Sequence, residues 1–193
     1  MGRKLLDKDG PTLGLRCSQD LYHKLIFDAE RLSKDWNGYD AFNFLVTAWH
    51  LFNDWTKSDP KKALSRSKRN KRILCSEMIL VLDVVKDLVN GSKHFELDKK
   101  NADNRKVEQT HNGLEADYYS FFFHEDILGV SVVGGWYFSI RVLHNIIINY
   151  YHWVFDDNKP CREFPPEILE AIEYCNIAKR HSGSAPEIWA ANS

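Results

Sequence analysis

The feature that most constrains the fold is an apolar stretch with helical period between residues 73 and 88. Its side chains recur at successive turns and cover a wide face: Leu74, Met78, Val81, Val85 and Leu88, broadened by Ile73, Leu80 and Val84. A helix with so broad an apolar surface needs two or more neighbours to cover it. We therefore expect a central helix that starts somewhere within residues 61–72 and reaches at least Leu88.

Two segments before this one supply neighbouring helices. The first is expected to begin at an N-cap, Ser18, and to end at Gly38. The second is expected to be capped by Asp40 and to carry its apolar stripe as far as Trp55. Because only a few residues join them, the two helices should pack as an antiparallel hairpin.

Two more helices are expected after the central one. Ser139 can cap a helix whose apolar side continues to Val154, and the run 156–158 should stop it. Pro165 and Pro166 then open a shorter helix, because proline suits the first helical turn.

Between these helices the periodicity changes. Residues 98–116 are polar and charged and are interpreted as a loop. Segments 118–123, 127–133 and 136–138 are rich in aromatic and β-branched residues and are interpreted as strands. Gly134 and Gly135 have the composition of a two-residue hairpin turn.

These elements predict a mainly α fold, an up-down bundle of four or five helices with a small antiparallel β-meander inserted at about 118–138. The chain has 193 residues, of which 44% are hydrophobic, which suits one domain with a real core. We expect an irregular N-terminal arm over 1–17, a single helical-bundle domain over 18–180 and a flexible tail over 181–193.

Cysteine usage and hydropathy bear on the compartment. The four cysteines are scattered without a C-x-x-C pair, which favours a reduced, cytoplasmic protein. The sequence starts without an apolar leader, and no clean apolar stretch of about 20 residues is present, so we expect no signal peptide and no membrane contact.

Charge is unevenly distributed although the net charge is only −1. Residues 1–100 carry 19 Lys and Arg against 14 Asp and Glu, whereas residues 101–193 carry 7 against 13. Such a polarity suits self-association, and a homodimer is one interpretation.

Several common site motifs are absent from the sequence, among them the phosphate loop, G-x-S-x-G, H-E-x-x-H and the calcium loop. Eight histidines are available, but His23, His50, His144 and His152 show no spacing typical of metal ligands. We therefore expect no metal and no cofactor.

A strongly basic run precedes the central helix. Its cations are Lys61, Lys62, Arg66, Lys68, Arg69, Lys71 and Arg72. They could contact the phosphates of RNA, although interleaved aromatic residues for base stacking are missing. The alternative is a solvated, charged loop.

The end of the central helix carries the most specific candidate site. If the helix continues through Gly91, then Lys86, Asn90 and His94 follow one another at every fourth residue and share a face. An imidazole can take a proton from a ribose hydroxyl, a cation can stabilise the phosphate, and an amide can orient either one. If Asn90-Gly91 instead ends the helix, the set is dissolved.

The stretch Val89-Asn90-Gly91-Ser92-Lys93-His94 resembles the functional signature of the HEPN superfamily of small prokaryotic helical domains. That signature is an arginine, often followed by a polar residue, and then a histidine a few residues later, near the end of the third core helix. Asn90 and His94 fit it. Val89 stands where the arginine belongs, and shifted registers offer only Leu88 or Asp87. Lys86 or Lys93 could substitute, but lysine lacks the planar fork that grips phosphate.

The chain also resembles small bacterial proteins without assigned chemistry that carry an N-G-x-K-H-F segment and a later W-x-F. Here these are residues 90–95 and Trp153-Val154-Phe155. The HEPN resemblance covers roughly residues 18–155 and implies a dimeric bundle of toxin–antitoxin or phage-defence systems, which acts on RNA or binds a partner protein.

Together these observations predict a HEPN-like binding or dimerisation module that has lost the catalytic arginine. One alternative is a metal-independent ribonuclease in which His94 is the base, Asn90 orients the substrate, and Lys86 or Lys93 is the cation. A further alternative is a structural partner-binding protein unrelated to RNA.

Overall fold

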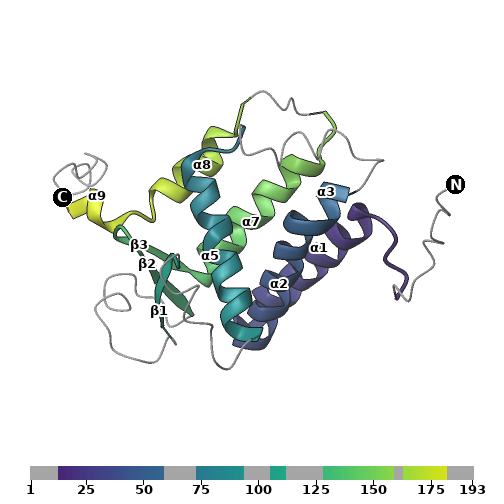
Figure 1. Cartoon of the computed structure of the whole chain (residues 1–193), viewed down its shortest axis with the longest axis horizontal. Coiled ribbons are helices and arrows are strands. Elements are labelled where there is room, and N and C mark those ends of the chain that lie inside the picture. Colours follow the sequence, from purple (N-terminus) through teal and green to yellow (C-terminus); the bar gives the residue numbers. More distant parts are fainter. Residues whose placement is uncertain (1–12, 59–72, 94–104, 112–127, 159–162, 182–193) are drawn as a thin grey trace, which may run out of the picture.

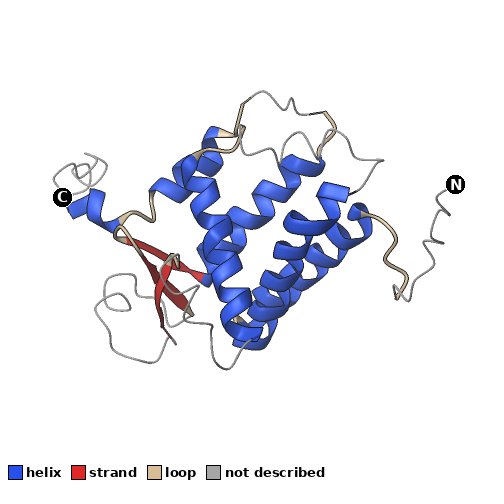
Figure 2. Cartoon of the chain, in the orientation of Figure 1, coloured by secondary structure: helices blue, strands red, loops and turns tan. Residues whose placement is uncertain are grey.

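The computed structural model of the chain describes residues 13–58, 73–93, 105–111, 128–158 and 163–181. It is mainly helical and carries one three-stranded antiparallel sheet (Figures 1 and 2). The predicted fold class, a helical protein with a small β insertion, is confirmed.

The two N-terminal helices form the predicted hairpin. Helix α1 spans Ser18–Asp35 and α2 spans Gly38–His50, and the two pack against each other. A π-helical turn, η1 (Leu51–Trp55), and the short α3 (Thr56–Ser58) continue α2. A buried contact holds the hairpin together: the Thr47 hydroxyl donates to the Asp28 carboxylate at 2.6 Å, and Lys24 pairs with the same carboxylate.

The predicted ends of these helices are corrected by one to three residues. The N-cap of α1 is Cys17 rather than Ser18, which is the first helical residue and is buried. The helix ends before Gly38, because Trp36 takes the left-handed conformation at φ 48°. Asn37 caps α2 in place of Asp40, and its side chain accepts the N–H of Asp40 at 2.9 Å.

Helix α5 (Ser76–Lys93) occupies the centre of the bundle, where it contacts α2, α8 and β1. Five of its apolar residues are fully or almost fully buried, Met78, Val81, Val84, Val85 and Val89, whereas Leu80 and Leu88 are half-buried. The expected broad apolar surface is therefore confirmed. The expected start within 61–72 is wrong for this helix, which begins at Ser76, after the basic run.

The C-terminal helices begin and end largely where the sequence predicts. Helix α7 (Ile140–Phe155) starts behind Ser139, whose hydroxyl accepts the N–H of Val142 at 3.3 Å, and ends before Asp156. Helix α8 (Pro166–Glu173) opens on a proline as expected. A short α9 (Ile177–His181) follows and ends at the first residue of the predicted tail.

The sheet has the order β1-β2-β3, with β1 at Val107–His111, β2 at Gly129–Val132 and β3 at Trp136–Ser139. Strands β2 and β3 form the predicted hairpin, and Gly134 and Gly135 both have positive φ, at 86° and 76°. Glycine adopts a positive φ without the steric cost that a residue with a Cβ atom would have.

Strand β1 corrects two predictions. It lies in the segment interpreted as a loop, and it extends the β insertion to well before residue 118. The predicted strand 118–123 lies outside the described residues. The Asp87 carboxylate of α5 explains why β1 forms where it does, since it accepts the N–H of Lys106 at 2.6 Å and of Val107 at 3.4 Å. A carboxylate from a distant helix thus holds the start of a polar strand.

Replacing Asp87 by alanine should detach the start of β1 from α5. Two backbone donors would lose a charged acceptor, so we expect a loss of about 1–3 kcal/mol in the free energy of unfolding. Urea denaturation measures this, and hydrogen exchange should show faster exchange at Lys106 and Val107. The isosteric Asp87→Asn variant, which keeps one oxygen acceptor, should lose less. Equal stability of Asp87→Ala and the parent would contradict the assignment.

Acidification should fray the first turn of α1. The N–H of Arg16 and the thiol and N–H of Cys17 all donate to Asp20, and they hold the pKa of its carboxyl below the usual value. A lowered folded-state pKa stabilises the fold above the unfolded value of about 3.9, and this stabilisation is lost as pH falls through the folded value. Amide NMR signals of residues 16–21 should follow that titration. In Asp20→Asn they should not, and an unchanged acid response in this variant would sink the prediction.

Candidate functional site

Helix α5 continues through Gly91 and ends at Lys93. Asn90-Gly91 is therefore not a helix stop, and Lys86 and Asn90 lie one turn apart on one face. Lys86 is exposed and Asn90 is half-buried. Neither side chain has a hydrogen bond or ion pair within the described part of the chain.

The remaining predicted site residues are only partly placed. Lys93 is the last residue of α5, and its side chain lies outside the described part of the structure. His94 and the whole basic run, Lys61 to Arg72, lie outside the described residues. Lys86, Asn90 and the backbone of Lys93 therefore lie on one helix. The roles of His94 and of the basic run stay predictions.

Val89, at the position of the missing arginine, is fully buried. The reason is rotational: neighbouring residues on a helix are about 100° apart, so the side chain before Asn90 turns from the solvent side to the core. Burying a valine contributes about 1.5–3 kcal/mol, which exceeds the cost of about 1 kcal/mol for a glycine inside a helix. Packing at Val89 therefore anchors the last fully buried position of α5 directly before Asn90-Gly91.

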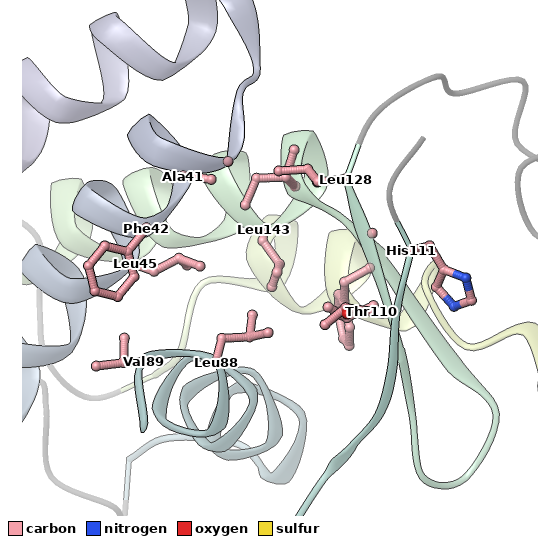
Figure 3. Close-up of a pocket in the computed structure, with 14 residues that line it drawn as sticks. Ala41, Phe42, Leu45, Leu88, Val89, Thr110, His111, Leu128 and Leu143 are labelled. Atoms are coloured by element: carbon pink, nitrogen blue, oxygen red, sulfur yellow. The ribbon is translucent and has the colours of Figure 1, made fainter. Parts of the chain in front are cut away.

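An apolar cavity of about 220 Å³ adjoins Val89 (Figure 3). Helix α2 contributes Phe42 and Leu45, α5 contributes Leu88 and Val89, and α7 contributes Leu143. The sheet closes the remaining side through Thr110, Val130 and Phe138, together with Leu128, the residue before β2. The cavity therefore lies where three helices and the sheet meet.

The lining of the cavity determines what it can hold. No Asp, Glu, Lys or Arg is among the described lining residues, and Thr110 contributes a hydroxyl group to the lining. His111 lines the cavity too, but its ring points away from it (Figure 3). Sequence reasoning missed this site because its walls come from distant segments, one of which was interpreted as a loop.

On the far side of the sheet, His111 Nε2 lies 2.6 Å from the Ser131 hydroxyl. Both side chains are buried, and the His111 ring also contacts the Tyr137 ring. The Tyr137 hydroxyl lies where a side chain on Gly129 would be, so that position requires glycine. His111 thus links the three strands on this side of the sheet, through a hydrogen bond to Ser131 of β2 and a ring contact with Tyr137 of β3.

The histidines considered as metal ligands each have a local partner. His152 Nδ1 lies 2.6 Å from the Tyr22 hydroxyl, and burial raises the pKa of that tyrosine. His50 is 3.0 Å from Asp54, and His23 and His144 are within hydrogen-bond distance of Gln19 and Asn145. Over the described ranges, no group of three or more His, Cys, Asp or Glu side chains is placed to hold a metal ion.

The sequence matches no family model, and comparisons with curated proteins and with solved structures find no match either. None of the helices described here is long and apolar enough to cross a membrane.

Replacing Gly91 by alanine tests the continuity of α5. Gly91 is exposed and helical, so alanine should raise the free energy of unfolding by about 0.5–1 kcal/mol by lowering the entropy of the unfolded chain. Urea denaturation provides the measurement. Gly134→Ala is the matched control and should be destabilising, because Gly134 has φ 86°. Destabilisation by Gly91→Ala would show that the helix ends there.

Proposed function

We propose that this protein is a HEPN-like, non-catalytic module that binds RNA and forms a homodimer. One observation carries the proposal: the residue in place of the signature arginine, Val89, is fully buried, while Lys86 and Asn90 remain on the outer face of α5. The position that would grip the phosphate is committed to the core, and the neighbouring polar positions still face outward.

The chemistry of the outer face supports binding more than cleavage. The Lys86 ammonium can pair with one phosphate oxygen, and the Asn90 amide can donate to a second or accept from a ribose hydroxyl. Cleavage requires in addition that the charge on the crowded phosphate be stabilised in a fixed geometry. A flexible lysine holds phosphate as a point charge and supplies no bidentate fork.

The setting of the module follows from the resemblance and from the charge distribution. The proposed context is a bacterial defence or toxin–antitoxin type system, in which the protein acts in the cytoplasm. The basic half of the chain can contact RNA or the acidic half of a second copy. A neighbouring gene in the same operon would encode the alternative partner, a protein.

The rival function is a metal-independent ribonuclease with His94 as base, Asn90 orienting and Lys86 or Lys93 as the cation. The continuity of α5 through Gly91 favours it, since it keeps Lys86, Asn90 and Lys93 on one helix. A purely structural, partner-binding role without RNA is the remaining alternative.

Incubation with RNA in the presence of EDTA separates binding from catalysis. We expect no cleavage by the protein or by its His94→Ala variant. Cleavage by the parent that disappears in His94→Ala would overturn the non-catalytic proposal and establish the ribonuclease. Cleavage that persists in His94→Ala would contradict a ribonuclease in which His94 is the base.

Binding is tested by an electrophoretic shift of labelled single-stranded RNA at low and high salt. Lys86→Gln and Asn90→Ala should each weaken binding by about fivefold to tenfold, because each removes one phosphate or ribose contact. Lys34→Gln, at an exposed lysine of α1, is the matched control and should bind like the parent. Light scattering should give the mass of a dimer. Absence of an RNA shift at any salt concentration would contradict RNA binding and favour a protein partner.

A further inference from the structure

We infer that the cavity between α2, α5, α7 and the sheet is a binding site for a small, neutral, apolar molecule. This site is separate from the outer face of α5 and goes beyond the proposed RNA-binding function. Its occupant is an aromatic or branched aliphatic compound with at most one hydrogen-bonding group.

The size of the cavity is the first argument. Protein interiors are close-packed, and voids much larger than a water molecule are few. An apolar cavity of about 150 Å³ is already large enough to take up benzene. At about 220 Å³, this cavity exceeds that size while its described walls belong to six elements. The cavity is partly open, because Thr110 is exposed and Leu88 and Leu128 are half-buried, so an apolar ligand entering it would displace water from apolar walls.

The composition of the walls defines the chemical class of the ligand. Phe42, Leu45, Phe138 and Leu143 offer apolar and aromatic surface from α2, β3 and α7. A charged group would have to leave water without a counter-charge from any described wall residue, which is strongly unfavourable. The Thr110 hydroxyl can donate to one oxygen or nitrogen of the ligand.

The place of the cavity connects it with the rest of the molecule. Leu88 and Val89 are wall residues, and Asn90 follows them on the same helical turn. Thr110 belongs to β1, whose start is held by Asp87 of α5. A bound ligand would therefore contact both α5 and β1 and should stabilise the two together.

Thermal denaturation and isothermal calorimetry with defined probes test the inference. Toluene and indole should bind saturably and raise Tm by about 5 °C at about a hundredfold excess over Kd. Ethylbenzene should bind as well, and benzylammonium, which matches ethylbenzene in shape but carries a charge, should bind at least about tenfold more weakly than ethylbenzene. No saturable binding of any neutral probe, or equal binding of benzylammonium and ethylbenzene, would overturn the proposal.

Variants locate the binding within the cavity. Ala41 is buried in the wall, and Ala41→Leu should occupy part of the cavity, weaken probe binding by at least about tenfold and leave Tm unchanged or raised. Ala171→Leu, the same change at an exposed position of α8, should bind the probes like the parent. Binding with unchanged affinity in a folded Ala41→Leu variant would place the probes elsewhere and refute the site.

A second variant keeps the test decisive if Ala41→Leu does not fold. Leu128 is a half-buried wall residue, and Leu128→Ala should enlarge the cavity. It should then bind a bulkier probe, naphthalene, at least about threefold more tightly than the parent does. Unchanged naphthalene affinity in this variant would count against the cavity as the site.

Discussion

The burial of α5 is the constraint on which the rest of the structure depends. This helix is apolar around most of its circumference, and Val81, Val84 and Val89 are completely buried. It contacts α2, α8 and β1, so the hairpin, a C-terminal helix and the sheet are all arranged around it. Only a narrow polar strip remains, which includes Lys86, Asp87 and Asn90.

That strip does two different things. Asp87 turns its carboxylate toward β1 and accepts two backbone N–H groups, which fixes the sheet to the helix. Lys86 and Asn90 turn outward and carry the proposed contact with RNA. The wall of the cavity lies on the opposite side at Leu88 and Val89. One helix therefore links the core, the sheet, the cavity and the outer site.

The sequence predicts those features that depend on neighbouring residues. The Ser139 cap, the proline start of α8 and the Gly134-Gly135 turn follow from local chemistry and are confirmed. Strand β1 could not be found in this way, since Glu108, Gln109 and Thr110 are exposed and polar and its anchor is 19 residues away along the chain. Pairing with β2 and the contact with Asp87 outweigh a poor local preference.

The end of α5 shows where local and tertiary effects compete. Asn90 and Gly91 are both weak helix formers, so residue types alone cannot decide whether the helix continues. In the structure α5 continues to Lys93, and the buried Val89 directly before this pair packs in the assembled bundle, which the local sequence does not describe. The cavity is still less predictable, because its walls come from six elements that are far apart in the sequence.

NMR of the labelled protein tests the central claim, that α5 is one helix with Val89 inside and Asn90 outside. The structure predicts helical backbone chemical shifts from Ser76 through Gly91 to Lys93. It also predicts contacts from the Val89 methyl groups to core side chains such as Leu45, which lines the same cavity. Helical shifts that stop before Asn90, or Val89 methyl groups in contact with water, would contradict the account.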